Sequence, residues 1–175
     1  METSTTKQLF SKDDLKKLII PLLFEQALAI TVGMADTVMI SSAGEAAVSG
    51  VSLIDMFNNL IISVLAALAT GGAVVTSQFL GAGKKEDACK SAKQLIVSSV
   101  CITIGISILV MVFCNGIISL FFGKIEADVF HNAVIYMMIS ALSFPFLALY
   151  NSCAALFRSM GNSQITLKVS VVENI

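Results

Sequence analysis

The chain has 175 residues, of which 56% are hydrophobic and 13% are charged, with a formal net charge of -1 and a mean hydropathy of +0.87. About a quarter of the residues of an ordinary soluble domain are charged, so this composition excludes such a domain and indicates an integral membrane protein. A near-neutral chain also lacks the basic surface that a nucleic-acid partner requires.

Hydrophobic runs long enough to cross a bilayer divide the sequence. About 20 apolar residues cross the roughly 30 Å hydrocarbon core. After a polar cytoplasmic leader at residues 1–14, we predict the amino-terminal lobe of a transporter over residues 15–175. Its complete spans are residues 15–40, 51–80, 94–122 and 134–157, and a fifth helix begins at residue 165. That helix rises only about 16 Å before the sequence stops, so we expect an all-α, polytopic helix bundle that is the amino-terminal part of a longer protein.

The stretch from Pro21 to Ser41, which makes up most of the first predicted span, contains two carboxylates and no basic residue to pair with them. Glu25 and Asp36 are eleven residues apart, which places them on one face of a helix, about 16 Å apart along its axis. An ionisable group at membrane depth costs roughly 2.5 to 3.5 kcal/mol on insertion scales and normally faces a polar cavity. Ala29 and Gly33 lie between the two acids on this face, which we therefore interpret as the lining of a cavity.

Polar side chains also mark the second and fourth spans. Asp55 and Asn59 belong to a polar row on the second span. They either line the same interior as Asp36 or form a local contact that caps the start of the helix. On the fourth span, Tyr136 and Asn151 lie on a broad polar side, which fits a binding pocket or ordinary interhelical hydrogen bonding.

Basic residues are distributed unevenly between the two ends of the predicted spans. Ten of the eleven Lys and Arg residues fall at the start of the chain or near alternate breaks, and only Lys124 falls near the other breaks. Basic residues are retained on the cytoplasmic side of a membrane. We therefore predict a multi-pass protein of the plasma membrane, surrounded by lipid, with a cytoplasmic amino terminus and Asp36 toward the outer end of its helix.

The predicted inward faces carry several acids and no Lys or Arg. A cavity of this kind favours cationic ligands and repels anionic ones. Loss of hydration also favours the neutral form of a carboxyl group, so these acids suit the uptake and release of protons. The sequence thus predicts a proton-coupled carrier with a cavity that favours cationic ligands.

Motifs of an enzyme or of a metal site are not found in the sequence. The four cysteines form no CxxC pair, and His131 has no second metal ligand at a suitable spacing and is interpreted as an interfacial residue. HExxH and GxxxxGK[ST] motifs do not occur either. We expect a protein that is not an enzyme and that uses no cofactor beyond a coupling H⁺ or Na⁺.

Four segments, in this order and at this spacing, resemble the multidrug and toxic compound extrusion (MATE) transporters. They are MADTVMIS around Asp36, GEAAVSGVS at residues 44–52, ALATGGAVVTSQFLGAG at residues 67–83 and RSMGN at residues 158–162. The resemblance implies about twelve helices in two six-helix lobes around a central cavity, with the second lobe supplied by the remainder of the same chain. It also implies a secondary active antiporter that exports organic cations or drugs in exchange for H⁺ or Na⁺.

The resemblance assigns roles to particular residues. Asp36 stands at the position of the first-helix acid that many members use for cation coupling, and Pro21 matches a proline at which that helix bends in one branch. Asn174 looks like the polar residue of the fifth helix. Glu25, Asp55, Asn59, Tyr136 and Asn151 would complete the cavity lining.

Two alternatives to the antiporter remain. A lipid or polysaccharide flippase of the same broad superfamily would need basic cavity residues to carry anionic lipids, and the predicted spans offer none. A non-functional, truncated remnant would leave the polar faces of the first two spans without partners.

Overall fold

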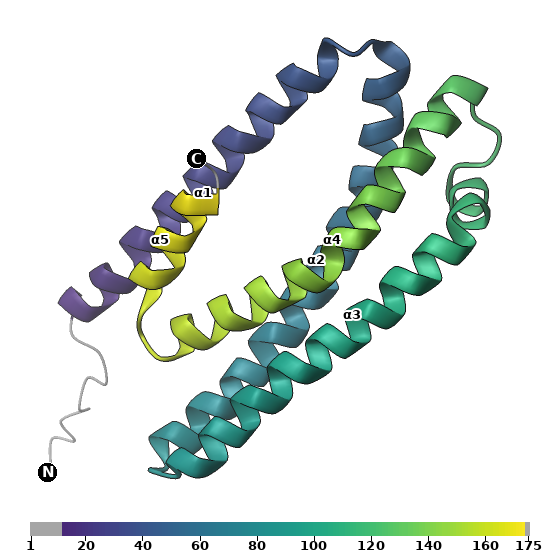
Figure 1. Cartoon of the computed structure of the whole chain (residues 1–175). Helices are drawn as coiled ribbons and strands as arrows, with labels where there is room; N and C mark the ends of the chain where they lie inside the picture. Colours follow the sequence, from purple (N-terminus) through teal and green to yellow (C-terminus); the bar gives the residue numbers. More distant parts are fainter. Residues whose placement is uncertain (1–11, 174–175) are drawn as a thin grey trace, which may run out of the picture.

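The computed structural model describes residues 12–173, which form five helices joined by short turns (Figure 1). In chain order they are α1 (Lys12–Ser41), α2 (Glu45–Gly81), α3 (Lys85–Phe122), α4 (Ala127–Ser159) and α5 (Ser163–Glu173). Within residues 12–173 no strand occurs, and four helices are long and apolar enough to cross a membrane. The predicted all-α bundle is confirmed. Asn174 and residues 1–11 of the predicted leader lie outside the described residues.

The helices extend beyond the predicted spans. α2 begins at Glu45 and not at residue 51, and α3 begins at Lys85 and not at residue 94. α4 likewise covers Ala127–Ser159, where the prediction was residues 134–157. The predicted boundaries followed the apolar runs, whereas the polar first and last turns of a membrane helix continue into the interfacial region. As a result Arg158, which was assigned to a break between spans, belongs to the last turn of α4.

Helices α2, α3 and α4 pack against one another along most of their lengths (Figure 1). On α4 the buried positions recur every three or four residues, which forms one continuous stripe: Ala133, Met137, Ala141, Phe144 and Ala148. Much of this stripe consists of small side chains, which let membrane helices approach closely. The Ser107 hydroxyl of α3 donates to the Ala141 carbonyl of α4 at 2.6 Å, which adds an interhelical hydrogen bond. We refer to α2, α3 and α4 as the three-helix block.

Helix α2 approaches the backbone of α4 closely at Gly50. A Cβ atom at this residue would lie 3.0 Å from both the Ala133 amide nitrogen and the Val129 carbonyl oxygen, and 3.2 Å from the Asn132 Cβ. Two of these three neighbours are backbone atoms that cannot rotate away. Any larger residue at this position would therefore require the two helices to move apart by a few tenths of an ångström.

Helix α1 lies mostly outside the three-helix block. Only 6% of its apolar window is buried in the structure, against 22% for α2 and 28% for α3 and α4. Its main neighbour is α5, and Figure 1 shows the two helices side by side. The structure thus consists of the three-helix block and an α1/α5 pair.

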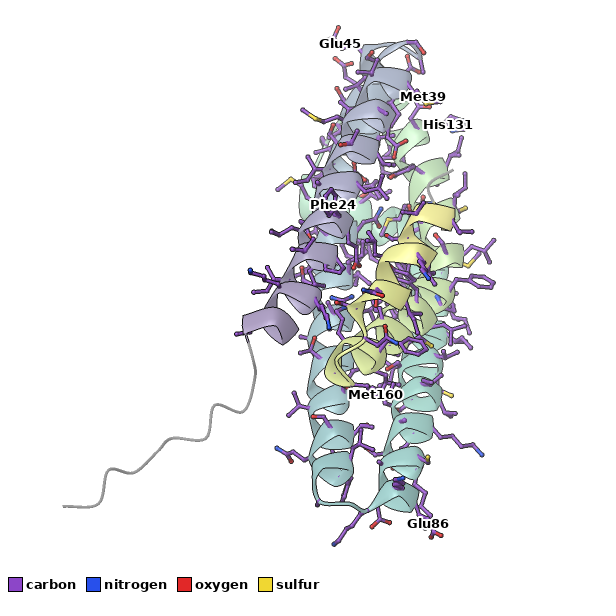
Figure 2. All side chains as sticks on the ribbon, turned by 90° about the vertical axis from the view of Figure 1, so that its left-hand side faces the viewer. Phe24, Met39, Glu45, Glu86, His131 and Met160 are labelled. Atoms are coloured by element: carbon purple, nitrogen blue, oxygen red, sulfur yellow. The ribbon has the colours of Figure 1, made fainter. Side chains whose placement is uncertain are left out.

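The turns alternate between the two ends of the bundle. The turn from α1 to α2 and that from α3 to α4 lie at one end, whereas the α2 to α3 turn and the start of α1 lie toward the other (Figure 1). Figure 2 shows Glu45 and His131 near the first end and Glu86 at the opposite end. Lys124 lies in the α3 to α4 turn, and Lys84 and Lys85 lie at the α2 to α3 turn. Successive long helices are therefore antiparallel, as the prediction of membrane orientation from the Lys and Arg residues assumed.

Candidate functional site

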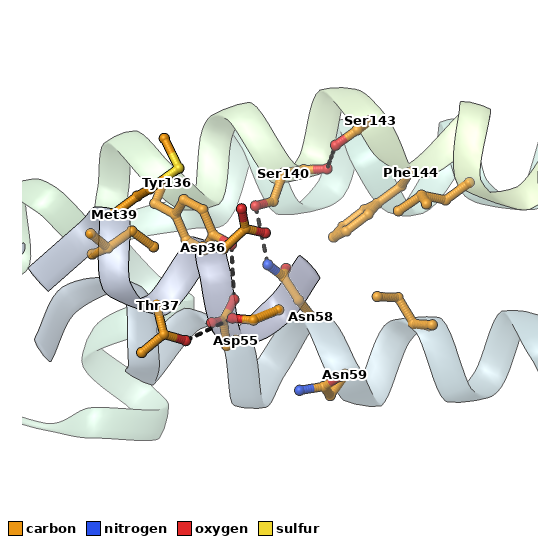
Figure 3. Close-up of a pocket in the computed structure, with 14 residues that line it drawn as sticks. Asp36, Thr37, Met39, Asp55, Asn58, Asn59, Tyr136, Ser140, Ser143 and Phe144 are labelled. Atoms are coloured by element: carbon orange, nitrogen blue, oxygen red, sulfur yellow. Dashed lines mark hydrogen bonds between the residues drawn. The ribbon is translucent and has the colours of Figure 1, made fainter. Parts of the chain in front are cut away.

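A cavity of about 720 Å³ lies between α1, α2 and α4, close to the α1 to α2 turn (Figure 3). We call it the Asp36 cavity. Its lining comes from the second half of α1, the first half of α2 and the middle of α4: Gly33, Asp36, Thr37, Met39, Ile40, Asp55, Asn58, Asn59, Ile62, Tyr136, Ser140, Ser143, Phe144 and Leu147. Among the described residues, the lining therefore supplies two carboxylates and no basic side chain.

Two hydrogen bonds join α2 to α4 within this cavity (Figure 3). The Tyr136 hydroxyl donates to Asp55 Oδ1 at 2.9 Å, and Asn58 Nδ2 donates to Ser140 Oγ at 3.1 Å. Asp55 is thus bonded across the helix interface, which favours the interpretation that it shares an interior with Asp36. Asn59 lines the same cavity. Binding roles for Asp36, Asp55, Asn59 and Tyr136 stay predictions.

Asn58 was not identified as a candidate from the sequence, although it is the most buried polar residue of the cavity lining, with 9% of its surface exposed. The available signal was a pair of adjacent amides, Asn58 and Asn59, in an otherwise apolar run. Only one of two neighbouring residues was assigned to the polar row, because successive residues point about 100° apart on a helix. The cavity is wide enough to take both.

The Tyr136 to Asp55 hydrogen bond predicts a measurable loss in the variant Tyr136→Phe. Removing the hydroxyl takes a donor from a carboxylate, and a hydrogen bond of this kind contributes about 1 kcal/mol or more. We expect a lower thermal unfolding midpoint of the purified protein in detergent. The matched control is Ser143→Ala, because Ser143 lines the same cavity but donates to the Ser140 carbonyl of its own helix at 2.8 Å. Equal losses in the two variants would contradict the prediction.

Glu25 does not lie in the Asp36 cavity. Its Oε1 atom is 3.8 Å from Arg158 Nη2 and accepts a hydrogen bond from the Tyr150 hydroxyl at 3.4 Å. The expectation that Glu25 has no basic partner is therefore wrong. The partner was missed because Arg158 was placed in a loop, whereas the last turn of α4 brings it beside α1.

A second cavity, of about 310 Å³, lies between α2 and α4 and has Asn151, Arg158 and Thr70 among its lining residues. The predicted polar side of α4 is therefore divided, with Tyr136 in the Asp36 cavity and Asn151 in this one. Arg158 also corrects the expectation that the inward faces carry no basic residue. Within the described part of the chain, no cluster of three His, Cys, Asp or Glu side chains is arranged to hold a metal ion.

Long apolar helices that enclose a polar, charged cavity define a multi-pass membrane protein of the transporter class. The family model described as MatE matches residues 21–175. The chain therefore belongs to the MatE family, as its resemblance to the MATE transporters predicted. This is a family of transporters.

Individual relatives agree with this assignment. The chain is 30% identical over 155 residues to an uncharacterized transporter, YisQ, of Bacillus subtilis (strain 168), a match that covers 89% of this chain and 34% of the relative. It is 24% identical over 168 residues to a probable multidrug resistance protein, NorM, of Thermotoga maritima (strain ATCC 43589 / DSM 3109 / JCM 10099 / NBRC 100826 / MSB8). This match covers 93% of this chain and 35% of the relative.

A solved structure has the same fold. A MOP superfamily transporter from Pyrococcus furiosus Vc1 (DSM3638) superposes with a TM-score of 0.84 at 20% identity, over 93% of this chain and 36% of that chain. That structure is described as having a binding pocket of reverse polarity, which suggests a different function for that protein. The chain spans about a third of the length of these relatives.

Proposed function

We propose that the full-length protein to which this chain belongs exports small organic cations in exchange for H⁺ or Na⁺. The observation that carries this proposal is the Asp36 cavity, which is lined by Asp36 and Asp55 and, among the described residues, by no basic side chain. A cavity with this charge attracts cations and excludes anions. The name of the Thermotoga relative, a probable multidrug resistance protein, is consistent with such a substrate class.

Exchange follows from competition at one carboxylate. Asp36 binds the coupling ion, and the cationic substrate needs the same negative charge, so the two ligands exclude each other. Asp55, held by the Tyr136 hydroxyl, and the amides of Asn58 and Asn59 complete the polar lining. Alternation between outward-facing and inward-facing states then couples the inward flow of the ion to the outward flow of the substrate.

The protein is proposed to lie in the plasma membrane with a cytoplasmic amino terminus. The support is the excess of basic residues at one end of the bundle. In this orientation the Asp36 cavity lies toward the outer face, and a second lobe supplied by the rest of the protein completes the central cavity.

The experiment that tests this function uses the purified full-length protein in liposomes. An imposed proton or sodium gradient is expected to drive the accumulation of ethidium, an organic cation, and not of carboxyfluorescein, an anion of similar size. Collapsing the gradient with an ionophore is expected to stop transport. Equal transport of the two dyes, or transport that does not depend on the gradient, would refute the proposal.

One observation favours the flippase as the second candidate. Arg158 lines the smaller cavity between α2 and α4 and offers a positive charge to an anionic headgroup. Glu25 lies 3.8 Å from this guanidinium, however, and compensates its charge. A fluorescent anionic lipid that crosses the same liposome membrane faster with the protein than without it would favour the flippase.

A further inference from the structure

In the interior of α1, Pro21 leaves one carbonyl without its usual helical donor. Proline has no N–H, so the carbonyl four residues before it loses its helical donor. In α1 that carbonyl belongs to Lys17, because the proline is Pro21. The Ser163 hydroxyl, at the first residue of α5, donates to the Lys17 carbonyl oxygen at 3.3 Å. Ser163 is 1% exposed, so little water competes for this bond.

A second set of contacts holds α1 one turn after the proline. Glu25 Oε1 lies 3.8 Å from Arg158 Nη2 and 3.4 Å from the Tyr150 hydroxyl, and both partners belong to α4. The Tyr150 hydroxyl also lies 3.5 Å from Ser170 Oγ of α5. Thus α5 contacts α1 before Pro21, α4 contacts it after Pro21, and the two contacting helices are joined to each other.

These contacts matter because, apart from its packing against α5, little of α1 is buried. Only 6% of its apolar window is buried. The helix is continuous from Lys12 to Ser41, and Asp36 lies fifteen residues after Pro21, which corresponds to about 22 Å along the axis. With this lever arm, a change of about 10° in helix direction at the proline would displace Asp36 by about 4 Å.

We propose that Ser163 and Arg158 are positioning residues: they clasp α1 on the two sides of Pro21 and thereby set where α1 places Asp36. The contacts of Ser163 and Arg158 with α1 are sufficient support for the clasp, whereas its effect on transport rests on the proposed function. Ser163 replaces the hydrogen bond that Pro21 removes, and Arg158 supplies the charge that holds Glu25 against α4.

The first test is a double-mutant cycle between Ser163→Ala and Pro21→Ala in the full-length protein. In the native background, Ser163→Ala removes the side-chain donor to the Lys17 carbonyl and is expected to lower the thermal midpoint by about 2 to 4 °C. In the Pro21→Ala background, the new backbone N–H bonds the Lys17 carbonyl, so the same change is expected to cost less than about half as much. Equal losses in the two backgrounds would overturn the role of Ser163.

Two further variants control for the possibility that Ser163→Ala destabilises α5 in general. Thr166→Ala removes another buried α5 hydroxyl, whose Oγ1 atom has no partner among the described residues, and its effect is expected to be the same in both backgrounds. Ser163→Thr keeps a hydroxyl and is expected to restore the native midpoint. If Ser163→Ala does not fold, the cycle is run with Ser163→Gly. Unequal losses in the two backgrounds then support the role of Ser163, and equal losses overturn it.

The second test measures position directly and needs no transport. Spin labels attached after Met34→Cys on α1 and Ile139→Cys on α4, both exposed in this chain, report their separation by double electron–electron resonance, with the native cysteines replaced by alanine. Ser163→Ala and Arg158→Gln are expected to shift or broaden the distance distribution by about 4 Å, as the lever arm requires, and Thr166→Ala is expected to leave it unchanged. A lower midpoint with an unchanged distribution would overturn the positioning role. An absence of cation export in liposomes would refute the proposed function and leave both tests valid.

Discussion

Asp36→Asn is expected to reduce gradient-driven export of organic cations by the full-length protein at least about fivefold and to remove its dependence on pH or Na⁺. The change keeps the size and shape of the side chain but removes the charge. An opposite charge at about 4 Å gains roughly 1 kcal/mol in water and about 4 kcal/mol at the surface of a protein, and each 1.4 kcal/mol is a tenfold change in affinity. The loss therefore lies between about fivefold and about a thousandfold.

The liposome assay with ethidium measures this loss, and initial rates are compared at equal amounts of folded protein. Glu45→Gln is the matched control, because Glu45 lies near the same end of the bundle (Figure 2) but does not line the Asp36 cavity. It carries the same change of charge and is expected to leave export within about twofold. Unchanged export and unchanged ion dependence in Asp36→Asn would show that this residue does not bind the coupling ion.

Gly50→Val is expected to have the largest effect on stability. Its side chain would start 3.0 Å from two backbone atoms of α4, so the two helices would have to separate. Overpacking of this kind costs about 1 to 3 kcal/mol, occasionally more, and we expect the upper end because backbone atoms cannot move aside. The expected result is a thermal midpoint lowered by about 6 °C or more.

Gly116→Val on α3 is the control, since a Cβ at Gly116 would have no atom within 4 Å. Both changes place the same β-branched residue inside a helix, so their intrinsic helix propensity cancels in the comparison. Scanning fluorimetry of the detergent-purified variants measures both midpoints. Similar losses in the two variants would mean that the close contact between α2 and α4 is not what stabilises the block.

The number and kind of helices could be predicted from the sequence, because the thickness of the hydrocarbon core sets how long an apolar membrane-spanning helix must be. An apolar run that matches the thickness of the hydrocarbon core has few other structures open to it. The juxtaposition of Asp36 with Asp55 also followed, since a short turn of small residues joins the ends of their helices. The helix boundaries did not follow, since polar residues such as Glu45 and Lys85 continue a helix where the apolar pattern has ended.

Contacts between distant parts of the chain could not be predicted. Glu25 and Arg158 are 133 residues apart in the sequence, and nothing in their local patterns links them. Pro21 was interpreted only as the position at which the first helix bends, and the Ser163 hydroxyl that contacts this part of α1 is known only from the packing. Gly50 resembled any other small residue in a turn-like segment until the approach of α4 was known.

Asp36 and Asp55 are carried by different parts of the structure, the first by the weakly buried α1 and the second by the three-helix block. Any movement of α1 against the block therefore changes the separation of two like charges. The mutual repulsion of two carboxylates rises as they approach, and a proton or cation between them removes that cost. Under the proposed function, occupancy of the cavity and the position of α1 are then linked in both directions: a bound cation favours the arrangement in which the acids are close, and that arrangement binds the cation more tightly. When the site is empty, the repulsion between the two carboxylates therefore favours the arrangement in which α1 lies farther from the three-helix block.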